Sequence, residues 1–394
     1  MKIQFDAFIG THYIGEEEKQ AVMEVLNSQS LFRYDGLNWL NKTGEFENEL
    51  SKFLGCENVL ACSSGTSALK LSCVSLEIGL GDEVIMSPFT YIASAGAVMA
   101  CGAVPVFVNI DESMNINPNE IESCITERTK AIMAIHMQGV PCDMQKIMKI
   151  AEKHNLKVIE DCAQAFGAKY SNQYVGTIGD AAAFSLQANK VITCGEGGVF
   201  LCKDSKQFVD GVRFHDNGGK REAGEYPIWN DPVCSFGENM KITELQSAIA
   251  IQQLKKIEEI IAKQKEQYEA LLQQLNYVKM RKIIKDVDFV PESLCLIFDS
   301  GEQCDLFIEK INKESVAFDF FSDHILTTYN TFLNKKSWGK HNMPYCFTDY
   351  KLNKCEYTYN LSKRTAWLSI HPLWNQSEIE YIAEKINKVY KMVM

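Results

Sequence analysis

Residues 131–163 have the sequence AIMAIHMQGVPCDMQKIMKIAEKHNLKVIEDCA, and this stretch decides the fold class. Its two ends, AIMAIHM and KVIEDCA, are short apolar runs of the kind that form buried strands. Between them, MQKIMKIAEKHN carries apolar residues at the spacing of one helix face. A helix that joins two buried strands is typical of a parallel sheet, because parallel neighbours need a crossover connection.

The same alternation of strand-like and helix-like runs extends from about residue 56 to residue 205. Further strands are predicted at NVLACSS, EVIMSP, VPVFVNI, AAAFSLQ and GVFLCKD, and a further helix at TSALKLSCVSL. The sequence therefore predicts an α/β fold in which a mostly parallel sheet lies between two layers of helices. Ligands of such sheets bind at the carboxyl ends of the strands.

A long helical pattern at residues 243–275 leads from this region into a more weakly patterned one. Beyond it, SLCLIFD indicates a strand, and QSEIEYIAEKINKVYKMV indicates an amphipathic helix. A chain of 394 residues has room for two domains. We expect a large three-layer αβα domain at residues 1–260 and a smaller α+β domain at residues 261–394.

Charge and cysteine content narrow the class of protein. The net charge of −11 disfavours nucleic acid or an anionic membrane as the main partner, because neither attracts an acidic surface. The 14 cysteines are scattered without CxxC spacing, which indicates reduced thiols and a cytoplasmic protein. Residues 91–110 carry no charge, but Gly102 and Pro105 divide them into a helix and a strand, so we expect a buried unit and not a membrane span.

Several common ligand motifs are missing from the sequence. It contains no GxxxxGK[ST] and no strand-bound GxGxxG, so neither a phosphate-loop nucleotidase nor a dinucleotide oxidoreductase is indicated. Neither HExxH nor a Cys/His spacing typical of metal sites occurs, and no metal is expected.

Three sets of polar residues follow predicted strands. The segment SSGTS, residues 63–67, begins a helix, and its N–H groups form either an ordinary cap or an anion site. Glu160 and Asp161 end an apolar strand, where only one of them points to a given face, either as a loop charge or toward a cationic ligand. Ser185 and Lys190 follow the next strand, and the lysine is either solvated or a nucleophile. Together these sets supply a phosphate cradle, a carboxylate and an amine, the groups that pyridoxal 5′-phosphate requires.

The chain resembles the DegT/DnrJ/EryC1/StrS aminotransferases, which act on keto-sugars and are fold-type-I pyridoxal-phosphate enzymes. The resemblance extends from FENELSKFLG to NMKITELQSAIAIQQL. The motifs that carry it are SSGTSALKL, GLGDEVIMSPFTYIASAGAV, GAVPVFVNID, EDCAQAFGA, GDAAAFSLQANKVITCGEGGVF and ENMKITELQSAI.

The resemblance implies a role for each matching residue. Lys190 would be the Schiff-base lysine, and Asp161 would pair with the pyridine nitrogen of the cofactor. Tyr91 would stack on the cofactor ring, with Gln164 near its phenolic oxygen. The resemblance assigns the phosphate to Gly65, Thr66, Ser67 and Ser185, and to Asn239 of a neighbouring subunit. A homodimer with shared active sites is therefore expected.

The implied reaction moves an amino group from glutamate or glutamine to a keto-sugar. The acceptor is left open between a nucleotide-linked keto-hexose, a keto-cyclitol and a sugar-acid aldehyde. Phe166 stands where many members of the family have histidine, and Lys241 stands where arginine is usual. The segment LFRYDGLNWLNK, residues 31–42, replaces a more common run of small residues. Arg33 in this segment and His324 are candidate substrate-binding residues, each of which could equally be structural.

Three other functions stay open at this stage. Sugar dehydratases of the same superfamily have histidine in place of the lysine, so Lys190 disfavours that reaction. A cysteine desulfurase shares the fold type, but no cysteine is marked as a nucleophile on a mobile loop. A regulator that only holds the cofactor would bind pyridoxal phosphate without reacting with any amino acid.

Overall fold

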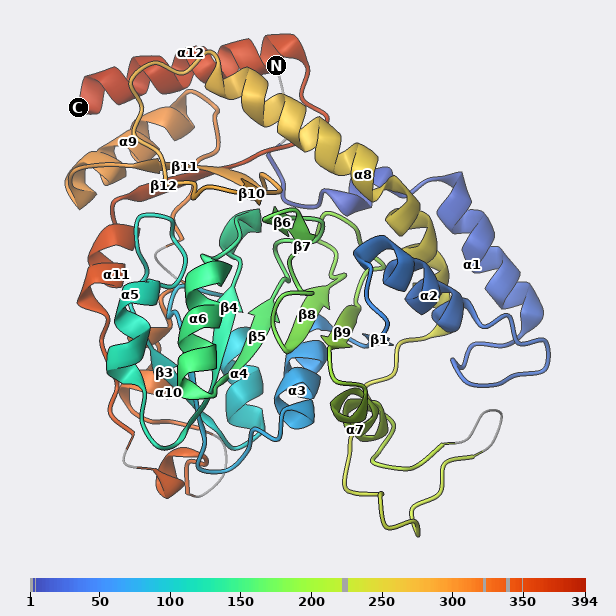
Figure 1. Cartoon of the computed structure of the whole chain (residues 1–394). Helices are drawn as coiled ribbons and strands as arrows, with labels where there is room; N and C mark the ends of the chain where they lie inside the picture. Colours follow the sequence, from blue (N-terminus) through green and yellow to red (C-terminus); the bar gives the residue numbers. More distant parts are fainter. Residues whose placement is uncertain (1–2, 4, 222–225, 322–323, 338–340, 349) are drawn as a thin grey trace.

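A seven-stranded sheet forms the centre of the computed structural model, which describes all residues except 1–2, 4, 222–225, 322–323, 338–340 and 349 (Figure 1). Its strands are β1 (Val59–Cys62), β2 (Glu83–Met86), β3 (Val104–Phe107), β4 (Thr129–Ile135), β5 (Lys157–Asp161), β8 (Ala181–Ser185) and β9 (Gly198–Cys202). They lie in the order β1-β9-β8-β5-β4-β2-β3. Each strand predicted from the apolar runs of this region is present.

The sheet is mostly parallel, as the sequence predicts. Four neighbouring pairs, from β3 through β2, β4 and β5 to β8, run parallel. Strand β9 is antiparallel to both of its neighbours, β1 and β8. Because β1 then runs in the same direction as β8, the carboxyl ends of β1, β5 and β8 meet at one edge of the sheet.

Helices cover both faces of this sheet (Figure 1). Alternation along β1 sends Leu60 and Cys62 into one core cluster and Val59 and Ala61 into another. The first cluster is covered by α3 (Gly65–Ser75), α4 (Ala93–Ala100) and α7 (Ser205–His215). The opposite face is covered by α2 (Lys42–Leu54), α5 (Pro118–Ile121), α6 (Met144–His154) and α8 (Glu244–Leu272). The predicted three-layer arrangement is therefore confirmed.

Helix α6 shows how local sequence sets the crossover between β4 and β5. Asp143 caps its amino end by accepting a hydrogen bond from the Lys146 N–H at 3.2 Å. Asn155, at a φ of 52°, ends it in the left-handed conformation that asparagine tolerates. In between, Met144, Ile147 and Ala151 face the sheet, and the polar residues face solvent.

The carboxy-terminal part of the chain builds a second, smaller core. Its strands β11 (Ser293–Ile297) and β12 (Thr365–Ser369) pair antiparallel, and α9 (Gly301–Lys313) and α12 (Gln376–Val393) pack beside them. Helix α8 contributes Ile257 to the large core and Leu271 to the small one, so one continuous helix joins the two. Helix α1 (Glu16–Ser28) packs on the first half of α8.

Short elements fill the connections. Strand β10 (Val287–Asp288) pairs with β6 (Lys169–Tyr170), which also pairs with β7 (Gln173–Tyr174). Helices α10 (Asn330–Leu333) and α11 (Glu356–Ser362) lie between β11 and β12 in sequence. Residues 91–110 form α4 and β3, and Gly102, at a φ of 87°, makes the left-handed turn between them.

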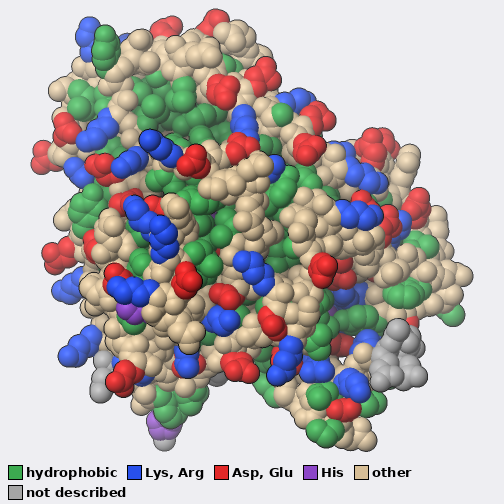
Figure 2. All heavy atoms as spheres, in the orientation of Figure 1, with side chains coloured by type: hydrophobic (Ala, Val, Ile, Leu, Met, Phe, Trp, Pro, Cys, Tyr) green, Lys and Arg blue, Asp and Glu red, His purple; other side chains and the backbone are tan. Residues whose placement is uncertain are grey.

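The surface and the thiols are consistent with the composition. Acidic and basic side chains are intermixed over the face seen in Figure 2, which presents no broad basic surface. All 14 cysteines are free thiols, and most of them are buried. None of the helices in the described part of the chain combines the length and the apolar character needed to cross a bilayer.

Candidate active site

A pocket of about 510 Å³ lies at the sheet edge where β1, β5 and β8 end. Many of the polar residues that follow these strands in sequence line it, as the carboxyl-end rule for parallel sheets predicts. Of the predicted site residues, eight line this pocket: Gly65, Thr66, Tyr91, Asp161, Gln164, Ser185, Lys190 and His324.

Lys190 is half-buried in the turn that follows β8. Its N–H donates to the Gln187 carbonyl at 3.0 Å, and its own carbonyl accepts from the Gly10 N–H at 2.9 Å. These bonds fix the backbone, while the amine forms no hydrogen bond or ion pair with the described residues. A half-buried amine without a protein partner is available for a ligand, and surface charges are rarely arranged in this way.

Asp161 ends β5 and is almost fully buried, with 5% of its surface exposed. Its carboxylate accepts hydrogen bonds from the Ser94 hydroxyl at 2.7 Å and from the Ala163 N–H at 3.1 Å. Burial raises the pKa of Asp161, and the positive charge of Lys190 opposes this effect. The site therefore stabilises a cation placed against this carboxylate.

The neighbouring acid, Glu160, points to the other face of the sheet. It accepts hydrogen bonds from His136 Nε2 at 3.1 Å and from the N–H groups of Ile178 and Gly179 at 2.8 and 2.6 Å. Although burial opposes ionisation, these partners hold the pKa of Glu160 below its usual range. Glu160 is thus a satisfied structural acid, and Asp161 is the member of the pair that faces the pocket.

The start of helix α3 forms the anion-binding side of the pocket. Ser64 caps the helix by accepting from the Ser67 N–H at 3.0 Å, which leaves the N–H groups of Gly65 and Thr66 without an intrahelical partner. Ser185 lies directly beside them: a Cβ at Gly65 would stand 2.9 Å from the Ser185 Cβ. Glycine at residue 65 therefore lets the helix start approach the end of β8, so that N–H groups and a hydroxyl meet at one place.

Tyr91 and Gln164 line the pocket in different ways. Tyr91 is 61% exposed, so its ring is open to a ligand. The side-chain oxygen of Gln164 accepts from the N–H of Gln138 at 2.9 Å and from its Nε2 at 3.1 Å. Because its oxygen is occupied, Gln164 has its amide nitrogen available as a donor.

Three predicted site residues do not line this pocket. Ser67 lies one turn into α3 and shares its hydroxyl with Ser63 and Ser64 at 2.9 Å. Asn239 is exposed on the segment before α8. Arg33 is buried and donates to the Ala61 carbonyl and to Glu47, both at 2.8 Å. This geometry favours the structural alternative for Arg33, because its guanidinium holds the partly buried Glu47 carboxylate behind β1.

The carboxy-terminal part of the chain closes the pocket with residues that the sequence analysis did not single out. Glu292, Phe321 and Ser369 line it beside His324. Two further residues were not predicted from the sequence: Ser94, which holds Asp161, and Gln138, which holds Gln164. Ser94 lies four residues after Thr90 on a predicted helix, but nothing local marks it as a partner of a residue 67 positions away.

Phe166 replaces the histidine that is frequent in the family, and it does not reach the pocket. It is buried, with its ring centroid 4.7 Å from that of Phe184 and 6.5 Å from that of Phe53. At this position the chain therefore has an apolar side chain that belongs to the core beneath the sheet.

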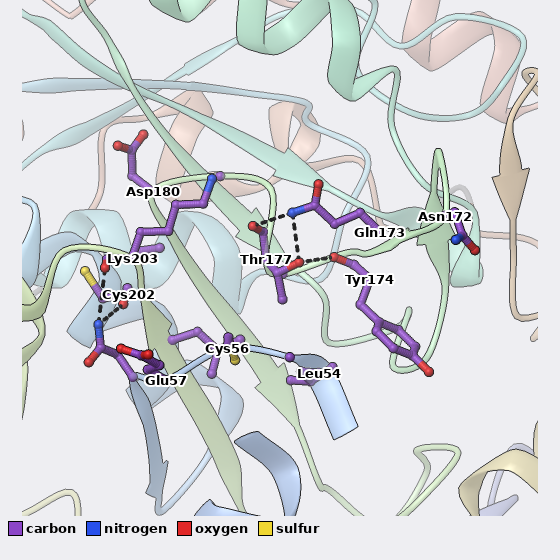
Figure 3. Close-up of a pocket in the computed structure, with 16 residues that line it drawn as sticks. Leu54, Cys56, Glu57, Asn172, Gln173, Tyr174, Thr177, Asp180, Cys202 and Lys203 are labelled. Carbon is purple, nitrogen blue, oxygen red and sulfur yellow. Dashed lines mark hydrogen bonds between the residues drawn. The ribbon is translucent and has the colours of Figure 1, made fainter. Parts of the chain in front are cut away.

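A second cavity, of about 450 Å³, lies at the opposite edge of the sheet (Figure 3). Its polar groups bond mostly to one another: Asn58 donates to the Cys202 carbonyl at 2.9 Å, and Gln173 donates to the Thr177 carbonyl at 2.9 Å. Its amine, that of Lys203, donates to the Ile178 carbonyl, and its Asp180 carboxylate pairs with Lys157 at 3.2 Å. Because it does not combine an unpaired amine with a buried carboxylate as Lys190 and Asp161 do, the first pocket is the candidate active site.

Within the described part of the chain, two groups of side chains are close enough to share a metal ion, namely Asp6, His12 and His371, and His136, Glu160 and Cys162. In both groups a histidine Nδ1 accepts a backbone hydrogen bond, from the Leu373 N–H to His371 and from the Cys142 N–H to His136. The proton of each neutral ring then lies on Nε2, which makes that atom a donor and not a metal ligand.

The fold and this pocket define the class of protein. A mostly parallel sheet between helices, with an amine, a buried carboxylate and an anion-binding helix start at one edge, is the arrangement of a fold-type-I pyridoxal-phosphate enzyme. Residues 12–387 match the DegT/DnrJ/EryC1/StrS aminotransferase family. The chain belongs to this family and is an aminotransferase.

Individual relatives agree with this assignment. The chain is 33% identical to the GDP-perosamine synthase of Escherichia coli O157:H7 over 95% of its own length and 96% of that protein. It is 30% identical to the spore coat polysaccharide biosynthesis protein SpsC of Bacillus subtilis over 96% of its length and 95% of SpsC. Among solved structures, an aminotransferase from Psychrobacter cryohalolentis superimposes with a TM-score of 0.84 at 29% identity, covering 96% of this chain and 98% of the other.

Proposed function

We propose that the protein transfers an amino group from glutamate or glutamine to a keto-sugar in the biosynthesis of an amino sugar. The observation that carries the proposal is the meeting of the Lys190 amine and the buried Asp161 carboxylate in one pocket. The names of two relatives support a sugar as the acceptor substrate, since one is named for GDP-perosamine and another for a spore coat polysaccharide. The acceptor is a nucleotide-linked keto-hexose, a keto-cyclitol or a sugar-acid aldehyde.

The pocket fits pyridoxal 5′-phosphate in its donor and acceptor groups. The free N–H groups of Gly65 and Thr66 and the Ser185 hydroxyl suit a phosphate, since a helix start favours an anion. Burial raises the pKa of Asp161, so a nearby cation such as a protonated pyridine nitrogen stabilises its ionised carboxylate. The exposed Tyr91 ring offers a stacking face, and the Gln164 amide offers a donor.

The bound cofactor supplies a carbonyl that forms an imine with amines and a ring that withdraws electrons from the neighbouring carbon. Lys190 would anchor it covalently and, once displaced by the substrate amine, would accept a proton from the substrate carbon and return it. Asp161 would keep the ring nitrogen protonated. Ser94 and the Ala163 N–H hold Asp161 in place, so its position does not change between the two half-reactions.

The residues of the pocket fit the alternative functions less well. A dehydratase of this superfamily has histidine where this chain has Lys190. A desulfurase needs a thiol at the site, and none of the cysteines in the described part of the chain lines the pocket. A cofactor-binding regulator is distinguished by experiment, because it does not react with amino acids.

We further propose that two copies of the chain share their active sites. Asn239 is exposed beside the segment that precedes α8, where it is available to a second copy. Large apolar side chains are also exposed, namely Phe236, three residues before Asn239, at 77%, and elsewhere on the described surface Tyr226 at 85% and Leu37 at 86%. Surfaces of this kind are typical of protein interfaces, and a symmetric dimer would form two equivalent sites.

The test of the proposed function is the amino-donor half-reaction. The protein loaded with pyridoxal phosphate is mixed with L-glutamate or L-glutamine, and the cofactor absorbance and the 2-keto acid product are followed. One equivalent of keto acid for each site, followed by recovery of the original spectrum on addition of a keto-sugar, is expected. A spectrum that no amino acid changes would identify a binding protein and would refute the proposal.

A further inference from the structure

Glu292 brings a carboxyl group from the small domain into the active-site pocket. It directly precedes β11, where its N–H donates to the Val290 carbonyl at 2.8 Å. Its carbonyl accepts from the Ile370 N–H at 3.0 Å, directly after β12. Because its backbone is tied to both strands of the small sheet, the Glu292 side chain is presented from a rigid base.

The Glu292 carboxyl has no hydrogen-bond or ion-pair partner among the residues that the structure describes. The nearest charge that acts on it is the amine of Lys190. Burial raises the pKa of Glu292 to about 7, and Lys190 opposes the shift only in part. Acidic groups are rarely left half-buried and unpaired, so this carboxyl indicates a ligand that donates hydrogen bonds.

The other ligands of the pocket meet this requirement less well. A phosphate carries anionic oxygens, which a carboxylate repels, and the hydrogen-bond donor that both amino-acid donors share is the α-amine, which is taken up by the reaction with the cofactor. A sugar carries hydroxyl groups, which donate to carboxylates with the strength of charge-assisted hydrogen bonds. Ser369, in register with Ser293 on the paired strand, lines the same wall and adds a hydroxyl beside Glu292.

We propose that Glu292 is a substrate-binding residue that accepts hydrogen bonds from hydroxyl groups of the keto-sugar acceptor. This inference rests on the proposed function and extends it, because it assigns the acceptor-recognising wall of the pocket to the small domain. L-Glutamate carries no hydroxyl group, so Glu292 distinguishes it from the sugar that uses the same pocket in turn. An acceptor without hydroxyls near its carbonyl carbon is bound less tightly.

The experiment compares wild type, Glu292→Gln and Glu302→Gln in separate half-reactions of the holoenzyme. Glu302 is an exposed glutamate of the same domain, so its variant controls for the loss of one negative charge. The donor probe is L-glutamate, and the sugar probes are GDP-perosamine, scyllo-inosamine and 6-amino-6-deoxygluconate, followed by stopped-flow absorbance. Glu292→Gln is expected to raise the half-saturating concentration of the reactive sugar probe on the order of tenfold and that of L-glutamate by less than about twofold.

A second measurement separates binding from structural damage. In wild type, the half-saturating concentration of the sugar probe is expected to fall as pH rises through the range in which Glu292 ionises. This pH-dependent fall is expected to be absent from Glu292→Gln and present in Glu302→Gln. The proposal is wrong if both substrates weaken equally in Glu292→Gln, or if neither weakens. If wild type reacts with L-glutamate but with no sugar probe, the proposed sugar acceptor fails, and the role of Glu292 fails with it. If wild type does not react with L-glutamate either, it is the aminotransferase function that fails.

Discussion

The Asp161 carboxylate, at the end of β5, and the Lys190 amine, in the turn after the adjacent parallel strand β8, line one pocket. The charge of the lysine partly offsets the effect of burial on the pKa of the aspartate. Neither group forms an ion pair with another described residue. The two charges are therefore held near each other but left available, which suits a cofactor that binds between a nucleophile and an acid.

The Lys190 amine is expected to anchor the cofactor covalently. Reduction of the holoenzyme with borohydride should attach the cofactor to the peptide that contains Lys190, as seen by mass spectrometry, and Lys190→Ala should abolish the label. Lys206→Ala, which removes an exposed lysine from α7, should leave the label unchanged. Labelling of another lysine in wild type would contradict the assignment.

Asp161 and Glu160 are adjacent acids with different predicted effects. Asp161→Asn removes the charge that faces the pocket and should slow the L-glutamate half-reaction on the order of 10²-fold with little change in unfolding temperature. Glu160→Gln disturbs three hydrogen bonds within the protein and should instead lower the free energy of unfolding by about 2 kcal/mol. Single-turnover kinetics and thermal denaturation of both variants test this division, and an Asp161→Asn variant of normal rate would refute it.

Arg33 is expected to act in stability and not in substrate binding. Arg33→Met leaves the partly buried Glu47 carboxylate without its ion-pair partner, which should cost about 3 kcal/mol of unfolding free energy. Adding Glu47→Gln to this variant should restore part of the loss, because the unpaired charge is then gone. If Arg33→Met keeps its stability and loses only affinity for the sugar, Arg33 reaches the substrate after all.

Glu292 should make the stability of the cofactor-free protein depend on pH. Its pKa of about 7 in the folded protein lies above the ordinary value of 4.5, so the folded state holds this proton more tightly than the unfolded state. The contribution of protonated Glu292 to the free energy of unfolding is fully present below about pH 4.5 and is lost as pH rises through about 7. Glu292→Gln should therefore be more stable than wild type by about 3 kcal/mol at pH 8, and the gap should close toward pH 5. Denaturation of both proteins across this range, with Glu302→Gln as control, measures the difference.

A shared active site predicts complementation between two inactive variants. Asn239→Asp would set a carboxylate against the phosphate of the partner's cofactor, and Lys190→Ala lacks the anchoring amine. After subunit exchange of an equal mixture, half of the dimers contain one intact site, so activity should recover to roughly a quarter of wild type. Mass measurements confirm the exchange. No recovery beyond the separate variants would show that Asn239 acts within its own chain.

Much of the large domain could be predicted because its signals are local. Short apolar runs become strands, and Asp143 and Asn155 begin and end a crossover helix by bonds within a few residues. The pocket edge also follows from local sequence, since parallel strands place the residues after their carboxyl ends together. The antiparallel direction of β9 was not predicted, because strand direction depends on pairing partners that periodicity does not encode.

By itself, the sequence determined the element types, the family and the order in which a helix start, Asp161, Ser185 and Lys190 reach one sheet edge. Only the tertiary structure decided which of two adjacent acids faces the pocket, that Arg33 is buried against Glu47, and that Glu292 and Ser369 close the site. The reason is physical: side-chain period and capping act over a few residues. Burial and pairing join segments that lie from 14 residues apart, as with Arg33 and Glu47, to about a hundred apart, as with Lys190 and Glu292, through packing that no short pattern specifies.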